Sequence, residues 1–122
     1  MPRIPRPVHG VLDYCSAILL AVSPWLFGFK EQHLAPEFAL VGGAAIVLMS
    51  LFTNYELGLI RLFPFPAHLL FDFVVGILLA TNWIHFAFGG KAGVVFTIFG
   101  VWSLVVALFT RHTGPMKTPT AT

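Results

Sequence analysis

The sequence predicts an all-α membrane protein in which four transmembrane helices form two tandem helix pairs. The first observation behind this prediction is composition, since hydrophobic residues make up 57% of the 122 residues and charged residues only 10%. Soluble domains carry roughly 25% charged residues, so this chain lacks the charge to cover a surface that faces water. The second observation is a series of four long apolar segments separated by short polar or Gly/Pro-containing segments.

The third observation is an internal repeat. Segment 5–29, PRPVHGVLDYCSAILLAVSPWLFGF, returns in altered form at 64–88, PFPAHLLFDFVVGILLATNWIHFAF, with 10 of 25 positions identical. The shared frame P-x-P-x-H-x-x-x-D contains residues that apolar composition alone would rarely align. The sequence LFT also follows both the second and the fourth apolar segment. We therefore expect a single domain over 1–122, with repeats at 5–56 and 64–112 and a polar tail at 113–122.

The first span is expected over 8–29. The prolines before it are tolerated in a first helical turn, where the missing N–H would have no partner. Its apolar run exceeds the usual core of a signal peptide and recurs in the middle of the chain, so we interpret it as a retained helix. Pro24 should either kink this helix or end its regular part, leaving 25–29 as an interfacial turn.

The other spans are expected over 36–53, 66–88 and 92–110. The connection between the two pairs, 54–65, could include a short interfacial helix. Glu56 could pair with Arg61 across a short amphipathic turn, or it could cap the repeat from below. Since each pair contributes an even number of spans, both pairs keep the same orientation. The predicted symmetry is a pseudo-two-fold axis along the membrane normal.

The distribution of lysine and arginine predicts the orientation. One side of the predicted membrane carries five cations and the other carries two: Arg3, Arg6, Arg61, Arg111 and Lys117 against Lys30 and Lys91. The positive-inside rule then places both termini in the cytoplasm, with Trp25 and Trp83 as anchors at the outer interface. The cations form no basic stripe, which argues against nucleic-acid binding. A lone cysteine, Cys15, excludes an internal disulfide.

Two His–Asp pairs, His9 with Asp13 and His68 with Asp72, could carry chemistry, because each pair is four residues apart on one helix face. One interpretation is structural, with the aspartate near a helix N-terminus and the histidine fixing the chain. A second is functional, as a proton relay, ion site or ligand pocket, because ionisable groups in spans are costly. A third is a haem with two axial histidines, or a divalent ion held by all four residues. No CxxCH or HExxH motif accompanies the pairs.

Small residues continue both helix faces beyond the His–Asp pairs. Small residues at helical spacing let helix backbones approach closely, so we expect the first and third spans to meet or cross along these faces. The second and fourth spans offer further close contacts. The predicted packing residues are Ala17, Ala21, Ala39, Gly43, Gly76, Ala80, Ser103 and Ala107.

The segment HGVLDYCSAILLAVSPWLFGF, with Ser23-Pro24-Trp25, resembles the SPW-repeat integral membrane proteins of prokaryotes, and LFTNYELGL is similar to the segment that follows the motif in that family. The resemblance covers about residues 5–112. It implies a two-helix repeat and a location in the prokaryotic cytoplasmic membrane. The second copy has Asn82-Trp83-Ile84 where the motif has Ser-Pro-Trp, so the third span should lack the proline kink.

The predicted role is non-enzymatic, without catalytic residues, resident metal or cofactor. The chain would be a structural or accessory membrane protein that associates with the lipid bilayer and with other membrane subunits or copies of itself. A small oligomeric transporter or an ion or proton channel, using His9, Asp13, His68 and Asp72, is the first alternative. A haem- or quinone-binding redox module is the second.

Overall fold

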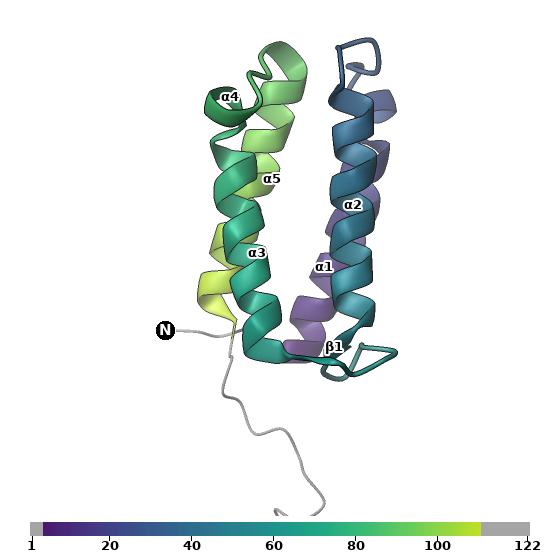
Figure 1. Cartoon of the computed structure of the whole chain (residues 1–122), viewed down its shortest axis with the longest axis vertical. Helices are drawn as coiled ribbons and strands as arrows, with labels where there is room; N and C mark the ends of the chain where they lie inside the picture. The colour runs from purple at the N-terminus through teal and green to yellow at the C-terminus, as the bar shows by residue number, and fades with distance from the viewer. Residues whose placement is uncertain (1–3, 111–122) are drawn as a thin grey trace, which may run out of the picture.

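The structure, a computed structural model, describes residues 4–110, so that Arg3, Arg111 and Lys117 lie outside the described residues. It is mostly helical, and α1 with α2 forms one hairpin while α3 with α5 forms another (Figure 1). The two hairpins stand side by side, and the two connections within hairpins lie at the same end (Figure 1). The elements are α1 (Arg6–Leu26), α2 (Ala35–Leu51), β1 (Thr53–Asn54), β2 (Phe63–Pro64), α3 (Phe65–Ala80), α4 (Asn82–His85) and α5 (Gly90–Phe109).

Two helices, α1 and α5, are long and apolar enough to cross a membrane. They have 21 and 20 residues, and a rise of about 1.5 Å per residue gives each a length of about 30 Å, the thickness of a bilayer's hydrocarbon core. Helices α2 and α3 are also apolar but have 17 and 16 residues. The third predicted span, 66–88, is therefore divided into α3 and the short α4.

Within the first hairpin, α1 and α2 pack at Gly43. A Cβ atom at Gly43 would lie 2.6 Å from the carbonyl oxygen of Ala17 and 3.0 Å from the Cβ of Ala21. No side chain fits at that distance, so the glycine permits a close approach of the two backbones.

Gly100 of α5 makes the equivalent contact in the second hairpin. A Cβ atom there would lie 2.6 Å from the carbonyl oxygen of Gly76 and 2.2 Å from the backbone nitrogen of Ala80. The small residues of α1 and α3 thus pack against the other helix of their own hairpin. We expected these residues to join the first and third spans, and this is a correction, because α1 and α3 meet through their polar residues instead.

The apolar side chains divide between an aromatic cluster at one end and an exposed outer surface. Phe29 and Phe96 meet edge to face with ring centroids 5.6 Å apart, and Ala39 is buried beside them. The outer surface, in contrast, exposes large apolar side chains on every long helix. One example from each is Ile18 (62% exposed), Val41 (68%), Leu70 (64%) and Val94 (60%).

Pro24 lies inside α1, and the helix continues to Leu26. Proline has no N–H to donate to the carbonyl four residues earlier, which belongs to Leu20. The hydroxyl of Ser23 donates to that carbonyl at 2.6 Å. The chain thus supplies a side-chain donor where the backbone donor is missing, and the helix is not ended by the proline.

The third span lacks the proline but is the one that is interrupted. Helix α3 ends at Ala80, and α4 begins at Asn82 after Thr81. The side-chain amide of Asn82 donates to the carbonyl of Leu79 at 2.7 Å. The third predicted span, 66–88, thus has no proline kink, but its helix is interrupted at Thr81.

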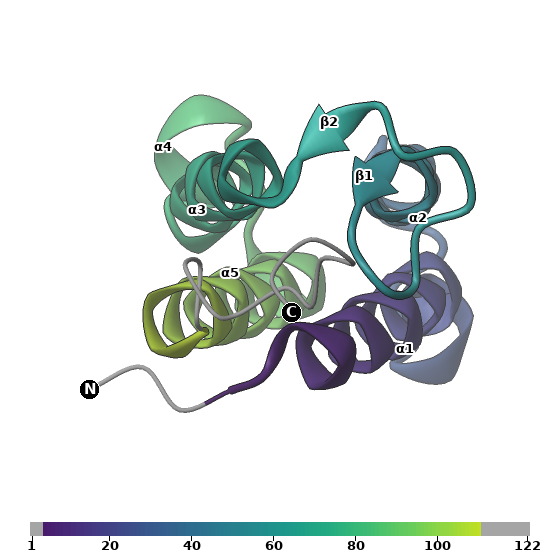
Figure 2. The ribbon, with the colours of Figure 1, turned by 90° about the horizontal axis from the view of Figure 1, so that it is seen from below.

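The connection between the hairpins forms two very short strands, and 55–62 contains no helix. Thr53 of β1 pairs with Phe63 of β2 in parallel, and these strands lie between α2 and α3 (Figure 2). Ile4 pairs with Thr110 in the same parallel sense. The prediction of a short interfacial helix there was wrong. Glu56 was predicted to pair with Arg61, but its Oε2 lies 3.5 Å from Nη2 of Arg6 instead.

Candidate functional site: a buried His/Asp centre

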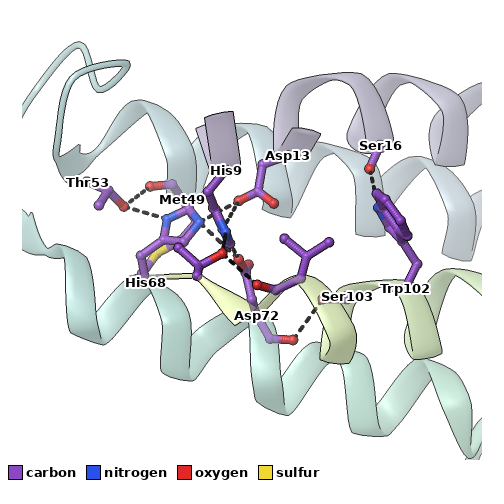
Figure 3. A network of polar contacts seen from close by, with 11 residues as sticks. His9, Asp13, Ser16, Met49, Thr53, His68, Asp72, Trp102 and Ser103 are labelled. Carbon is purple, nitrogen blue, oxygen red and sulfur yellow. Dashed lines mark hydrogen bonds and ion pairs between the residues drawn. The ribbon is translucent and has the colours of Figure 1, made fainter. Parts of the chain in front are cut away.

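Four ionisable side chains meet between the hairpins, near the end where α1 and α3 begin (Figure 3). We call His9, Asp13, His68 and Asp72 the His/Asp centre. Both imidazoles are fully buried, and the side chains of Asp13 and Asp72 are only 12% and 4% exposed. The histidines lie in the first turn of their helices and the aspartates one turn further along. The sequence thus predicted each pair, and the structure brings the two pairs together.

The shorter contacts run between helices. His9 Nε2 lies 2.8 Å from Asp72 Oδ2 and 3.1 Å from Asp13 Oδ2. His68 Nε2 lies 2.5 Å from Asp13 Oδ2 and 3.2 Å from Asp72 Oδ2. Each histidine therefore binds most closely to the aspartate of the other hairpin, and the four groups form a closed ring that links α1 to α3.

A threonine orients each imidazole from its other nitrogen. His9 Nδ1 lies 2.8 Å from Thr110 Oγ1, and His68 Nδ1 lies 2.8 Å from Thr53 Oγ1. Thr110 follows α5, and Thr53 lies in β1, just after α2. The centre therefore combines side chains of α1 and α3 with threonines that lie just after α2 and α5.

The threonine hydroxyls determine where the imidazole protons lie. Thr53 Oγ1 donates to the carbonyl of Met49, and Thr110 Oγ1 donates to the carbonyl of Val106. A hydroxyl has only one hydrogen, so each oxygen must accept from the Nδ1–H of its histidine. Both Nε2 atoms are thereby directed at the carboxylates.

Aromatic rings cover the centre toward the end of the bundle. The ring of Phe65 stacks on His68 with centroids 5.8 Å apart and meets His9 edge to face at 5.5 Å. Tyr55 stacks on the same phenylalanine at 5.3 Å. Burial raises the pKa of the Tyr55 phenol, so this group stays neutral beside the centre.

A cavity of about 20 Å³ touches the opposite side of the centre, with Asp13 and Asp72 in its lining. One water molecule needs about 10–15 Å³ measured in this way. Ser16 and Trp102 line both this cavity and an apolar groove of about 490 Å³ between α1 and α5. Trp102 Nε1 donates to Ser16 Oγ at 3.0 Å (Figure 3). The hydrogen bond therefore joins two residues that separate the centre from the groove.

The remaining predicted residues lie outside the centre. Trp25 and Trp83 are 53% and 61% exposed at the end that holds the hairpin loops. Ser103 donates to the backbone carbonyl of Asp72 at 2.9 Å, and Ala107 is half-buried on α5. Cys15 is exposed and lines the groove.

Sequence reasoning missed three polar residues that hold this arrangement. Thr53 and Thr110 carried a usable signal, because both belong to the repeated LFT sequence. Asn82 carried no such signal in the sequence, apart from its alignment with Ser23 in the internal repeat. Its amide nitrogen also lies 3.2 Å from the carbonyl of Gly93 and 3.1 Å from Thr97 Oγ1, which ties the end of α3 to α5.

The geometry fits a single ion better than a haem. The imidazole centroids of His9 and His68 are only 5.4 Å apart, with their planes at 78°. Asp13 and Asp72 occupy the space between the two Nε2 atoms, so a porphyrin would have to displace both. Comparison with protein-family models, curated proteins and solved structures found no match for this chain.

Proposed function

We propose that this chain is a small, non-enzymatic integral membrane protein whose four long helices all span the bilayer. The observation that carries the proposal is the distribution of side chains: large apolar groups face outward on every long helix, while the ionisable groups of α1 and α3 face one another. Charged groups inside a bilayer face the protein interior and pair with one another. The same distribution would be unstable in water.

The shorter helices α2 and α3 are compatible with spanning. They run alongside α1 and α5 (Figure 1), and a bilayer accommodates a short span by local thinning or by placing flanking residues at the interface. Helix α4 and its exposed Trp83 extend the third span toward the loop end, where a tryptophan suits the headgroup layer.

The tandem arrangement is part of the proposal. Matching positions in the two hairpins make matching contacts, such as His9 with Thr110 and His68 with Thr53. These contacts support two repeats related by a pseudo-two-fold axis along the membrane normal, in the prokaryotic cytoplasmic membrane that the SPW-repeat resemblance implies.

The orientation can be tested directly. Arg6 and Arg61 belong to the end that holds the hairpin starts and their connection, whereas Lys30 and Lys91 belong to the loop end. The positive-inside rule places the arginine end in the cytoplasm. Single cysteines at the exposed positions Lys30 and Arg61, in a Cys15→Ala background, should be labelled by an impermeant maleimide at position 30 only. Labelling of intact cells at position 61 alone would reverse the proposed topology.

We further propose that the protein acts by assembly, as a structural or accessory subunit. The apolar groove between α1 and α5 is a continuous exposed surface that includes Cys15, Leu19 and Ile98. Extraction at native expression level in a mild detergent, followed by native mass spectrometry, should show this chain in a larger particle with itself or another subunit. A monomer across detergents and concentrations would refute the assembly role. Release from membranes by alkaline carbonate would refute membrane integration.

Ion or proton transport is the second candidate, and the small cavity beside Asp13 and Asp72 is the observation that favours it. Reconstituted vesicles should then show a flux that Asp13→Asn with Asp72→Asn abolishes. The variant that replaces the exposed residues His33 and His85 by glutamine should keep the flux. Equal flux in both variants would eliminate this candidate.

A further inference from the structure

We propose that the His/Asp centre binds one divalent transition-metal ion, of which Zn²⁺ is the representative, through two imidazole nitrogens and two carboxylate oxygens. This goes beyond the role in assembly and departs from the metal-free site expected from the sequence. Four residues, His9, Asp13, His68 and Asp72, would supply one ligand atom each.

The first argument is convergence. One potential ligand atom from each of the four residues lies within 4.8 Å of the other three. These residues come from two different hairpins, so the convergence is a product of the tertiary fold and not of helix spacing alone. Four donors from packed helices are also the way that helical bundles commonly build metal sites.

The second argument is the orientation of the imidazoles. Metal-binding histidines almost always donate their other ring N–H to a neighbouring acceptor, which fixes the tautomer and the ring plane. Thr110 and Thr53 serve as that acceptor for His9 and His68, and each hydroxyl is itself held by donation to a helix carbonyl. Both imidazoles are therefore held in the orientation that metal binding through Nε2 requires.

The third argument is charge. With both Nδ1 atoms protonated, neutral imidazoles would present their Nε2 lone pairs to the oxygens of Asp13 and Asp72, and like partial charges would face one another in a buried place. One divalent cation removes this conflict, because its charge of +2 balances two carboxylates while two neutral imidazoles act as ligands. Two protons on the four groups are the alternative occupants, and metal and protons compete for the same atoms.

The geometry requires a small rearrangement. Ligands about 2.0–2.2 Å from a tetrahedral Zn²⁺ lie about 3.4 Å from one another. The four His–Asp contacts are 2.5–3.2 Å, so they would open by up to about 1 Å around an ion of this kind. The small cavity beside both aspartates leaves room for the carboxylates to move outward.

The donor set selects the class of ion. Imidazole suits Zn²⁺, Fe²⁺, Co²⁺ and Cu²⁺, whereas Mg²⁺ and Ca²⁺ prefer oxygen ligands at higher coordination numbers. Two nitrogens with two oxygens thus favour a first-row transition metal. The absence of sulfur from the four donors makes a Cu⁺ site less favourable.

The test uses the full chain, purified in detergent without a histidine tag and stripped with a chelator. Calorimetric titration with Zn²⁺ in two buffers of different ionisation enthalpy should give one ion per chain and the release of about two protons, as metal replaces protons on shared ligands. Co²⁺ should give the visible absorption of a four-coordinate N/O site. A chain that binds no ion, or binds one with fewer ligands than four, overturns the proposal.

Matched variants locate the site. The variant His9→Gln with His68→Gln should lose Zn²⁺ binding, while His33→Gln with His85→Gln, which removes two exposed histidines, should keep it. The reverse result would overturn the proposal.

Because the first variant could unfold, Thr53→Val with Thr110→Val offers a milder change that keeps all four ligands. It should weaken Zn²⁺ binding roughly 10–100-fold, because the histidine ligands lose the hydrogen bonds that orient them, and unchanged affinity would contradict the role given to these threonines.

The test also separates this inference from the role in assembly. Carbonate extraction and native mass spectrometry report on membrane integration and on partners, and neither measurement requires an ion. A membrane-integrated assembly whose stripped chains take up no Zn²⁺ would leave the proposed function standing and remove the metal site, with protons holding the ring together.

Discussion

The two ends of the bundle differ in how closely the hairpins match each other. At the end that holds the His/Asp centre, the polar contacts of each histidine have a counterpart in the other hairpin, including the threonine at its Nδ1. At the loop end, α1 continues through Pro24 whereas α3 stops at Ala80. At the matched end, each histidine bonds to the aspartate of the other hairpin, so each half constrains the other. At the loop end, Gln32 of the first hairpin bonds to the backbone of Gly89 and Ala92 in the second, while Ser23 and Asn82 bond within their own hairpins.

This comparison shows in which part of the bundle a substitution affects both hairpins. A residue in the centre serves as partner to its counterpart, so a change there disturbs both halves. A residue such as Ser23 or Asn82 satisfies carbonyls of its own hairpin. Substitutions at the centre should therefore have nearly equal effects in the two hairpins, and substitutions at the loop end should have unequal ones.

The largest expected effect is at the centre itself. Asp72→Asn leaves the buried His9 with one carboxylate partner, Asp13 at 3.1 Å, in place of two, and removal of one member of a buried ion pair costs about 3–5 kcal/mol. Asp13→Asn should lower the free energy of unfolding by a similar amount. Denaturant unfolding in detergent, followed by circular dichroism, measures both. A difference between them of more than about 2 kcal/mol, half of the expected loss, would show that the two halves of the centre are not equivalent.

Glycine packing should produce the next largest effect. Gly100→Ala places a methyl group 2.2 Å from the nitrogen of Ala80, and Gly43→Ala places one 2.6 Å from the oxygen of Ala17. Overpacking of this kind costs about 1–3 kcal/mol, with the greater loss at Gly100. Gly89→Ala is the control, since no atom lies within 4 Å of its added methyl group. Thermal unfolding should rank the three variants, and a wild-type midpoint for Gly100→Ala would contradict the packing.

The two threonines should also contribute equally to the free energy of unfolding, with smaller losses than those at the aspartates. Thr53→Val keeps the side-chain shape but leaves the Nδ1–H of His68 without an acceptor, which costs about 1–3 kcal/mol for a buried donor. Thr110→Val should cost the same at His9. A double-mutant cycle in the unfolding free energy measures the coupling between them. Additive losses would mean that the two halves of the centre do not communicate.

At the loop end, matching substitutions in the two hairpins should lower stability by unequal amounts. Asn82→Ala removes an amide that bonds to Leu79, Gly93 and Thr97, whereas Ser23→Ala removes one hydrogen bond to Leu20. At about 1 kcal/mol for each net hydrogen bond, the asparagine variant should lose two to three times as much stability. Hydrogen exchange at the end of α3 should report the same loss locally. Equal losses would place the two residues in equivalent roles.

The smallest expected effect is at the ion pair of Arg6 with Glu56. The two side chains lie 3.5 Å apart, the arginine 10% and the glutamate 41% exposed. Pairs of this kind contribute about 0–1 kcal/mol, so Glu56→Gln should shift the unfolding midpoint little and less still at high salt. A loss as large as that of Asp72→Asn would mean that this pair belongs to the centre.

The sequence predicted those features that depend on neighbours along the chain. Helical spacing placed His9 with Asp13 and His68 with Asp72, and small residues marked Gly43 as a close contact, whereas Gly100 was not among the predicted packing residues. It could not show that each histidine binds the aspartate of the other hairpin, because that depends on how the hairpins dock. Local spacing also suggested Glu56 with Arg61, whereas the fold brings Arg6 to Glu56.

Helix ends were the other source of error. Pro24 suggested either a kink in α1 or the end of its regular part, and the second is wrong, because the helix continues to Leu26 and Ser23 bonds to the carbonyl that the proline leaves free. No proline warned of the break after Ala80, where the amide of Asn82 binds across to α5. Both outcomes depend on side-chain hydrogen bonds that helix propensity does not describe.

The parallel pairing of Ile4 with Thr110 repeats the pairing of Phe63 with Thr53. The backbone bonds agree as well, since Ile4 N donates to the carbonyl of Phe109 and Phe63 N donates to that of Phe52, both at 2.8 Å. Each hairpin therefore finishes beside the point where the other starts. A circular permutant that opens within 55–62 and joins Thr110 to Ile4 through a short linker would keep every contact of the centre, so chain order is interchangeable in this architecture.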